Sequence, residues 1–222
     1  MKDLSFIMPR TPFANAWSAL GGLEIRIGKR VLKKESLEHR LKNISLAFDY
    51  ARSHITEPRV DIEEKQDSEG RTVAFCVDWR RTEDSKKARR ETEQVAAYCQ
   101  ALGLKLIRYE KQPFYDVYPV APDKGWALQE MLHGLMVESG VLYLGDSQTD
   151  NSAFKSSNIS VGVIHEETSV DTLDCDYLVN FEDVPDFLNM LIINNLLFSS
   201  DFPMLKANPH KMKKHCTEKT AS

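Results

Sequence analysis

Two aspartates four residues apart are the residues of this sequence best suited to chemistry. Asp146 follows Gly145 at the end of a short apolar run, and Asp150 comes where the chain enters a predicted helix. Gly145 is expected to allow a tight turn as the strand ends. Open α/β sheets bind ligands at the carboxyl ends of their strands, where Asp146 is expected to lie. Two carboxylates this close suit magnesium, a hard cation with oxygen ligands. The same two residues could instead cap the helix and solvate a turn.

A lysine upstream of the two aspartates adds a positive charge to this group. The triplet Asp123-Lys124-Gly125 opens a predicted helix over residues 126–136, which precedes the aspartates in the chain. The ammonium group of lysine is a compact cation that can lie beside a phosphoryl oxygen and a carboxylate. A lysine at a helix start otherwise faces solvent, so its position before the acidic pair is what makes Lys124 a candidate.

The two motifs together resemble those of the haloacid dehalogenase (HAD) superfamily of phosphatases. Residues 145–150, followed by Ala153 and Phe154, are similar to its last catalytic motif, and residues 118–128 are similar to its lysine motif. Members with a large α/β cap, such as trehalose-phosphate and sucrose-phosphate phosphatases, fit best. The resemblance runs from about residue 20 to residue 195.

This resemblance implies a magnesium-dependent phosphatase that hydrolyses a phosphomonoester through an aspartyl-phosphate. Asp146 and Lys124 would be catalytic, because a metal ion and a lysine neutralise charge on the transferring phosphoryl group. Asp146 and Asp150 would form the Mg²⁺ site, with Asp150 orienting Asp146 or a metal-bound water. Arg81 and His165, each after a predicted strand, are candidate substrate-binding residues. We expect a phosphorylated sugar as substrate, with trehalose 6-phosphate as the leading one.

The nucleophile of this family is not found in its usual place. The family places an Asp-x-Asp motif after an N-terminal apolar strand, but the apolar run at residues 4–8 ends in Pro-Arg-Thr-Pro, and Asp3 precedes it. Thr11 and Ser18 match the family's phosphate-gripping residue by type only. Three hypotheses stay open. The chain is a truncated or split phosphatase whose N-terminal core half lies upstream or on a separate chain, an inactive homologue that binds a sugar phosphate, or an unrelated α/β binding module.

The hydrophobic pattern divides the chain into four parts. Residues 1–20 are expected to be an N-terminal remnant of the core. Residues 21–118 show a strand, a helix, two strands, a helix and two strands, which predicts an α+β cap. Residues 119–198 are expected to form the C-terminal half of a HAD-like Rossmannoid core with a parallel sheet. The basic residues 199–222, poor in apolar side chains, are expected to be disordered. The predicted fold class is α/β, a partial core with an inserted cap.

The last helix of the core is expected to start at residues 182–185, where acidic side chains complement the helix dipole. Its apolar residues recur at helical spacing. The side chains expected to face the core are Phe187, Leu188, Leu191 and Ile192.

Composition argues against several classes of partner. The 222 residues carry a net charge of -4, which is atypical of a nucleic-acid-binding protein. No apolar run approaches the roughly 20 residues of a membrane-spanning helix, and no secretory signal is recognisable. The four cysteines are scattered without metal-ligand spacing. We interpret them as reduced thiols of a cytoplasmic protein, three of them buried.

Overall fold

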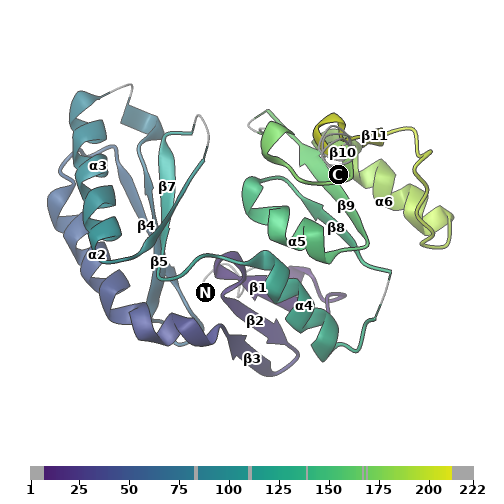
Figure 1. The fold of residues 1–222 in the computed structure, drawn as a ribbon, viewed down its shortest axis with the longest axis horizontal. Coiled ribbons are helices and arrows are strands. Elements are labelled where there is room, and N and C mark those ends of the chain that lie inside the picture. Colours follow the sequence, from purple (N-terminus) through teal and green to yellow (C-terminus); the bar gives the residue numbers. More distant parts are fainter. Residues whose placement is uncertain are drawn as a thin grey trace, which may run out of the picture. The chain divides into compact units, whose positions relative to one another are not determined.

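The computed structural model describes residues 8–82, 85–109, 112–138, 140–166, 168 and 170–211. The chain divides into two compact units between Pro122 and Asp123, a few residues beyond the boundary expected at 118. The two are called the N-terminal and C-terminal units below. Together they contain a parallel sheet and two antiparallel sheets (Figure 1), which confirms the predicted α/β class.

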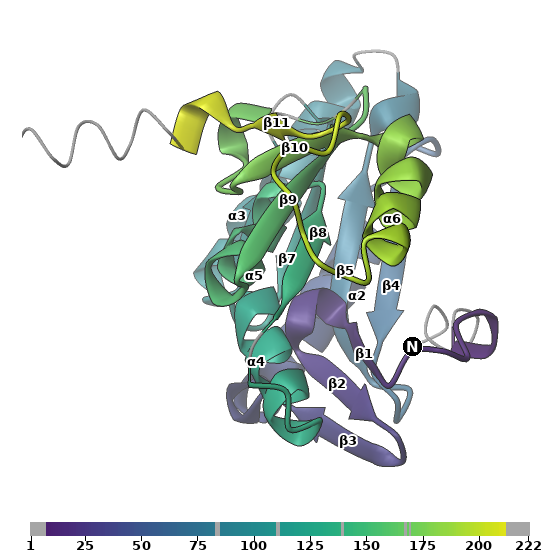
Figure 2. The ribbon, with the colours of Figure 1, turned by 90° about the vertical axis from the view of Figure 1, so that its right-hand side faces the viewer.

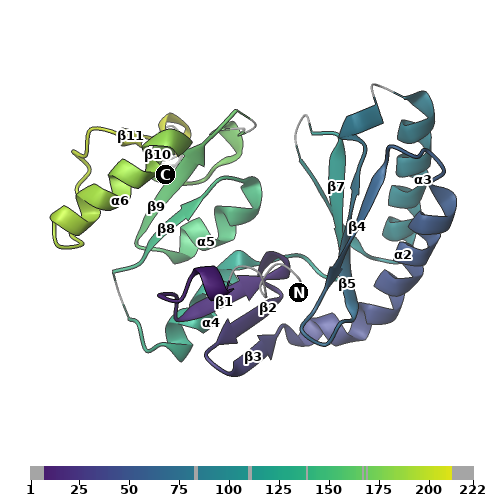
Figure 3. The same ribbon diagram turned by 180° about the vertical axis from the view of Figure 1, so that it is seen from behind.

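The N-terminal unit is built on an antiparallel sheet in the order β4-β5-β7-β6. Alternate residues of its strands point to one face, where Phe75 and Val77 lie opposite Val117 and Tyr115 and are fully buried. The helices α2 and α3 cover this face, as Figures 1 and 3 show. From α2 to β7 the order of elements matches the predicted helix, two strands, helix and two strands. The elements are α2 (Leu41–His54), β4 (Asp61–Gln66), β5 (Thr72–Asp78), α3 (Lys86–Ala101), β6 (Lys105–Arg108) and β7 (Phe114–Tyr118).

A three-stranded antiparallel meander precedes this sheet. It consists of β1 (Ala16–Ala19), β2 (Glu24–Ile27) and β3 (Arg30–Lys33), of which the sequence predicted only the middle strand. The flanking strands were missed because their sequences, Ala-Trp-Ser-Ala and Arg-Val-Leu-Lys, do not alternate between polar and apolar residues as the middle strand does. Residues 16–19 were expected to belong to a remnant of the core, but they pair with β2. Of the apolar run at 4–8, residues 4–7 lie outside the described part, and Met8–Arg10 forms a 3-10 turn.

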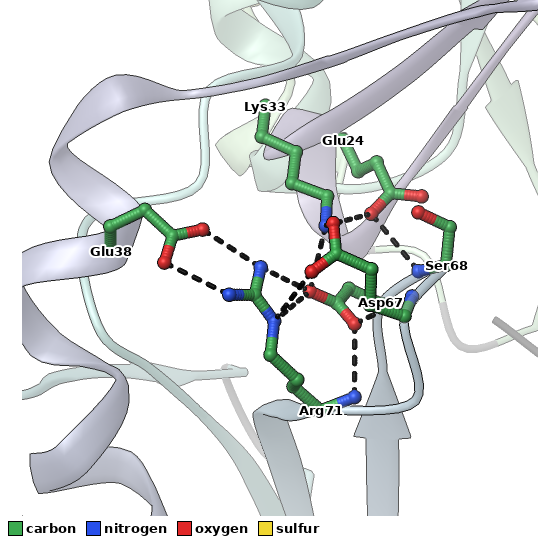
Figure 4. Close-up of polar contacts among 7 residues, drawn as sticks. Glu24, Lys33, Glu38, Asp67, Ser68 and Arg71 are labelled. Carbon is green, nitrogen blue, oxygen red and sulfur yellow. Dashed lines mark hydrogen bonds and ion pairs between the residues drawn. The ribbon is translucent and has the colours of Figure 1, made fainter.

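A buried ion network ties the turn between β4 and β5 to this meander (Figure 4). The Asp67 carboxylate has no solvent exposure. Its Oδ1 accepts hydrogen bonds from the backbone N–H groups of Glu69 and Arg71. Its Oδ2 accepts from Lys33 Nζ at 3.0 Å and Arg71 Nε at 2.9 Å. The Arg71 guanidinium also binds both oxygens of Glu38, at 2.9 and 2.8 Å. The turn between β4 and β5 is therefore held by Lys33 and by Glu38.

Glu24 of β2 extends the network. It is fully buried, and its Oε2 accepts from the backbone N–H of Ser68 at 3.1 Å and lies 3.8 Å from Lys33 Nζ. Within the described residues, its Oε1 is the buried side-chain oxygen without a hydrogen-bond partner. The network joins segments distant in sequence and is closed to solvent at its centre, which indicates a structural role.

The C-terminal unit is half of a doubly wound α/β core. Its sheet has the order β11-β10-β9-β8, in which β8, β9 and β10 are parallel and β11 is antiparallel. Figure 2 shows α6 on one face of the sheet and α5 on the other, and α4 packs against α5. Within the described strands, β8 is paired on one side only and forms an edge. The elements are α4 (Lys124–Gly134), β8 (Leu142–Gly145), α5 (Asn151–Ser156), β9 (Ile159–Ile164), β10 (Tyr177–Asn180), α6 (Val184–Ile193) and β11 (Lys206–Ala207).

Two expectations about this unit need correction. Residues 199–211 are folded, because Phe202 is buried against Phe187 and β11 pairs with β10. Only residues 212–222 of the expected disordered tail lie outside the described part. On α6, Phe187 and Leu191 face the core as predicted, but Leu188 and Ile192 are 43 % and 65 % exposed. The helical spacing of apolar residues predicted a wider buried face on α6 than the sheet covers.

Three of the four cysteines are described, and all three are free and buried, as predicted. Burial raises the pKa of the Cys76 and Cys99 thiols to about 12, so neither is a nucleophile. No described helix combines the length and the apolar character needed to cross a lipid bilayer.

Candidate functional site

One cavity in the C-terminal unit brings together most of the residues that the sequence singled out. Its volume is about 610 Å³. Asp146 follows β8 and His165 follows β9, so both lie at the carboxyl ends of adjacent parallel strands, where α/β sheets bind ligands. The cavity is lined by Lys124, Tyr143, Asp146, Asp150, His165 and Phe181, among others.

Asp146 is the open carboxylate of this site. Its side chain is 56 % exposed and lines the cavity. The described residues supply one hydrogen-bond partner, His165, whose Nε2 lies 3.3 Å from Asp146 Oδ2. An ionised carboxylate has about four lone-pair positions. Asp146 therefore keeps acceptor capacity on the cavity side for a cation or a water molecule.

Asp150, by contrast, is buried and fully used by protein donors. Its Oδ1 accepts from Lys124 Nζ and from the Tyr143 hydroxyl, both at 2.7 Å. Its Oδ2 accepts from the backbone N–H of Ser147 at 3.2 Å and from the Ser147 hydroxyl at 3.0 Å. All four lone-pair positions of Asp150 accept hydrogen bonds from the protein, so Asp150 caps the helix and holds Lys124. Its expected role as a second metal ligand stays a prediction.

Tyr143 is a residue of this cavity that the sequence analysis missed. It alternates with Leu142 and Leu144 along β8, so it points to the opposite face of the sheet, toward Phe154 of α5. Burial and the neighbouring Asp150 carboxylate raise the pKa of the Tyr143 hydroxyl above its usual range, so it stays protonated and donates. A polar residue within an apolar strand was the available signal.

Two glycines make the close approach of these groups possible. A Cβ at Gly145 would lie 2.5 Å from Asp150 Cγ, while the Gly145 φ angle is not in the left-handed region. The residue is therefore needed for space, and the tight turn predicted for it is not the reason. A Cβ at Gly125 would overlap the Ser152 carbonyl oxygen, so α4 and α5 pack closely and bring Lys124 to Asp150.

The other candidates belong to the N-terminal unit. Arg81 belongs to the N-terminal unit, is 80 % exposed on its side chain, and lies 3.4 Å from Asp61. Thr11 and Ser18 are in the same unit, where Thr11 accepts a hydrogen bond from Trp17 and Ser18 donates to a backbone carbonyl. Within the C-terminal unit the structure thus joins His165 to Asp146 and Lys124. Arg81 belongs to the other unit, and its substrate-binding role stays a prediction.

The triplet Asp174-Cys175-Asp176 has the spacing of the family's nucleophile motif but lies at the wrong end of a strand. It precedes β10, whereas Asp146 and His165 follow their strands. Asp176 accepts hydrogen bonds from the backbone and hydroxyl of Ser160 and from Lys211. These contacts close a loop at the amino ends of the parallel strands, so the triplet is not a substitute for the nucleophile.

Comparison with known proteins identifies the fold. No family model and no curated protein matches the sequence. Among solved structures, the chain is similar to a trehalose-6-phosphate phosphatase related protein, with a TM-score of 0.61 and 14 % identity over 86 % of this chain and 79 % of that one. The HAD subclass IIB sugar phosphatase BT4131 aligns with a TM-score of 0.58 and 12 % identity, over 89 % and 82 % of the two chains. A haloacid dehalogenase-like hydrolase from Bacteroides thetaiotaomicron aligns at 0.59 and 14 %, over 87 % and 81 %.

These similarities show that the chain has the fold of HAD-superfamily phosphatases, a Rossmannoid core with a cap. They confirm the resemblance expected from the lysine motif and the Gly145–Asp150 motif.

Proposed function

We propose that this chain binds the phosphoryl group of a sugar phosphate beside Mg²⁺, in the lineage of the HAD sugar-phosphate phosphatases. The observation that carries the proposal is the shared cavity, which is lined by the open Asp146 carboxylate and by Lys124. A carboxylate that can hold a metal ion and an ammonium group that can meet a phosphoryl oxygen are the two charges this chemistry requires. The nearby Asp150 keeps the Lys124 ammonium in place.

The residues present fit magnesium, with Asp146 as the protein ligand. Among the residues the structure describes, no group of three or more His, Cys, Asp or Glu side chains is arranged to hold a metal ion. Magnesium does not need such a cage, because it is usually bound by one or two carboxylates together with waters and substrate phosphate. When bound, the ion would neutralise charge on the phosphoryl group.

The cavity also supports a sugar-sized ligand. Its volume of about 610 Å³ lies within the range of small-molecule sites. Phe181 lines it and is 61 % exposed, so an aromatic ring is available to the apolar part of a ligand. Trehalose 6-phosphate remains the leading substrate, since one similar structure is named as related to a trehalose-6-phosphate phosphatase. The free cysteines suit a reducing compartment such as the cytoplasm.

Hydrolysis would require a nucleophile that the recognisable motifs of this chain do not supply. Among the described strands, β8 is the one that ends the sheet directly before Asp146, and such an edge accepts a further strand. We therefore expect the nucleophile on a strand that pairs with β8, supplied by an upstream segment or a separate chain. The chain alone would bind a sugar phosphate without turning it over.

Calorimetric titration tests the binding step. Inorganic phosphate and trehalose 6-phosphate are titrated into the full chain with and without MgCl₂. Replacement of Asp146 by Asn should raise the magnesium-supported Kd roughly tenfold or more, the cost of losing a charged interaction. The control is Asp186→Asn, an exposed aspartate of α6 outside the cavity lining, which should bind like the unmodified chain.

A phosphate-release assay then separates the three hypotheses. Release only after addition of an N-terminal segment with an Asp-x-Asp motif supports a split or truncated phosphatase. Binding without release under both conditions supports an inactive homologue. Absence of magnesium-dependent binding, or equal binding by Asp146→Asn, would falsify the proposed function and leave an unrelated module.

A further inference from the structure

Phe181 is an aromatic residue of the cavity whose ring lies largely in solvent. It lines the cavity and is 61 % exposed, whereas Phe187, the next phenylalanine of the chain, is fully buried. Single exposed apolar side chains are common on protein surfaces, so exposure alone assigns no role. Phe181 differs because the same cavity is lined by the Asp146 carboxylate and the Lys124 ammonium group. A ligand held by those charges therefore shares the cavity with an aromatic ring.

The turn that carries Phe181 is closed by its own hydrogen bonds. Phe181 begins a 3-10 turn that ends at Asp183. The Asn180 side chain donates to Asp183 Oδ2 at 2.8 Å, and the backbone N–H of Val184 donates to the Phe181 carbonyl oxygen. The backbone that presents the ring is thus ordered before a ligand arrives, which lowers the entropy cost of binding.

Asp146, His165 and Phe181 are each the first residue after one of three neighbouring parallel strands, β8, β9 and β10 (Figure 1). Asn180 pairs with Ile164, so Phe181 and His165 come next on the two strands and are neighbours. Adjacent strands lie about 4.8 Å apart, so two such spacings put the backbone of Phe181 on the order of 10 Å from that of Asp146. A phosphoryl group at Asp146 is too small to span this distance. The part of a ligand that meets Phe181 is therefore the group esterified to the phosphate.

Between Asp146 and Phe181 the cavity combines apolar side chains with one imidazole. Leu144 and Val163 line it, and His165 follows the strand between the other two. A pyranose ring presents C–H bonds on its face and hydroxyl groups at its edge. Its face can stack on the electron-rich face of the Phe181 ring, while a hydroxyl at its edge can hydrogen-bond the imidazole. An open-chain sugar phosphate has hydroxyl groups but no rigid apolar face to stack.

We infer that Phe181 is a specificity-determining residue, which selects phosphorylated sugars in the closed ring form over open-chain ones by stacking on the ring. The inference rests on the proposed function, because the phosphoryl group must be held at Asp146 and Lys124 for the sugar ring to reach Phe181. It goes further in assigning part of the choice of substrate to a single side chain of the C-terminal unit.

Calorimetric titration of the full chain in MgCl₂ with a matched pair of ligands tests this selection. Glucose 6-phosphate and sorbitol 6-phosphate have the same carbon chain and phosphate group, but only the first forms a ring. The unmodified chain should bind glucose 6-phosphate about fivefold more tightly than sorbitol 6-phosphate, which is the size of one aromatic contact. Phe181→Ala should remove this preference, while inorganic phosphate should bind as before.

Phe181→Trp and Ile193→Ala are the comparison variants. Phe181→Trp should keep the preference, because the indole ring offers the same kind of stacking face. Its tryptophan emission should change with glucose 6-phosphate more than that of the unmodified chain does. Ile193→Ala shortens a side chain of the same unit that is 75 % exposed and outside the cavity lining, so it should bind both ligands like the unmodified chain.

The outcomes separate this inference from the proposed function. If inorganic phosphate does not bind, or binds Asp146→Asn equally well, the proposed function fails and this inference fails with it. If phosphate binds as proposed but the two sugar phosphates bind equally, or Phe181→Ala keeps the preference, only this inference is overturned. Weaker binding of inorganic phosphate by Phe181→Ala would show that the side chain shapes the cavity as a whole, which also overturns its role in selection.

Discussion

Each of the two units contains a cluster of carboxylates and cations. In one cluster the central carboxylate is buried and hydrogen-bonded by the protein, whereas in the other a carboxylate remains exposed. In the N-terminal network, Asp67 is surrounded by donors from three residues and has no exposure. In the cavity of the C-terminal unit, Asp146 has His165 as its partner and is 56 % exposed. The number of charges in a cluster therefore does not identify a functional site. What distinguishes the cavity is acceptor capacity that remains open to a ligand.

Asp150 connects the two cases. It is saturated by donors like Asp67, yet one of those donors is Lys124, which lines the cavity. Asp150, whose oxygens are taken up by protein donors, thus holds the Lys124 ammonium in the cavity that Asp146 also lines. The two aspartates of one motif therefore have different surroundings, although their spacing alone made them equivalent candidates.

The largest expected effect distinguishes the two clusters by stability. Asp67→Asn removes the negative charge between Lys33 and Arg71, and losing one partner of a buried ion pair costs about 3 kcal/mol. Asp146→Asn, at an exposed position, should change stability by only about 0.5 kcal/mol or less. Urea unfolding followed by tryptophan fluorescence measures both, since Trp17 and Trp79 report on the N-terminal unit and Trp126 reports on the C-terminal unit. Equal losses in the two variants would contradict the contrast between a closed and an open cluster.

A smaller effect is expected from pH. Burial alone would raise the pKa of Asp67, but hydrogen bonds from the Arg71 backbone and from the Lys33 and Arg71 side chains outweigh it and lower the pKa to about 2. A carboxyl whose pKa is depressed in the folded state stabilises the fold above its unfolded pKa of about 4. That stability is lost as pH falls from about 4 toward 2.

The urea midpoint of the N-terminal unit should therefore fall over this pH window. We expect a loss on the order of 1 kcal/mol, because the cationic partners are partly exposed and solvent screens them. Asp67→Asn should flatten this dependence. If the variant keeps the full pH dependence, another group carries it.

The smallest effect is expected at the Tyr143 hydroxyl, which donates to the same Asp150 oxygen as Lys124. Tyr143→Phe removes one donor from Asp150 Oδ1, which should cost about 1 kcal/mol of stability. Lys124 would then pair more strongly with Asp150 and be less available to a phosphoryl oxygen, so we expect phosphate to bind a few-fold more weakly. Tyr177→Phe, whose ring packs on Phe198, is the matched control and should bind phosphate normally. Titration of both variants with phosphate tests whether the pairing of Lys124 with Asp150 affects how strongly phosphate binds.

Much of the fold could be predicted from periodicity. The long helices α2 and α3, the turn from Asp67 to Gly70 and the parallel strands β8 and β9 lie where apolar spacing placed them. The strands β1 and β3 were missed because their residues do not alternate between polar and apolar, as those of β2 do. Residues 199–211 were predicted to be disordered from their composition, although Phe202 anchors them to the sheet.

The site was predictable to the extent that it follows one sequence motif. Asp146, Lys124 and His165 were chosen for the ends of the strands and helices that carry them, and these ends converge on one cavity. Tyr143 and Phe181 were not chosen, because their roles depend on which face of a strand or which rim of a cavity they occupy.

The sequence by itself determined the elements and the identity of the charged residues, because apolar period and glycine position are local properties of the chain. Only the tertiary structure decided which carboxylate is saturated and which is open. That outcome depends on the donors that packing brings from distant segments: Lys124 and Tyr143 to Asp150, and Lys33 and Arg71 to Asp67. For the same reason Leu188 and Ile192 lie in solvent. Helical spacing specifies a face, but the width of the sheet beneath it determines how much of that face is covered.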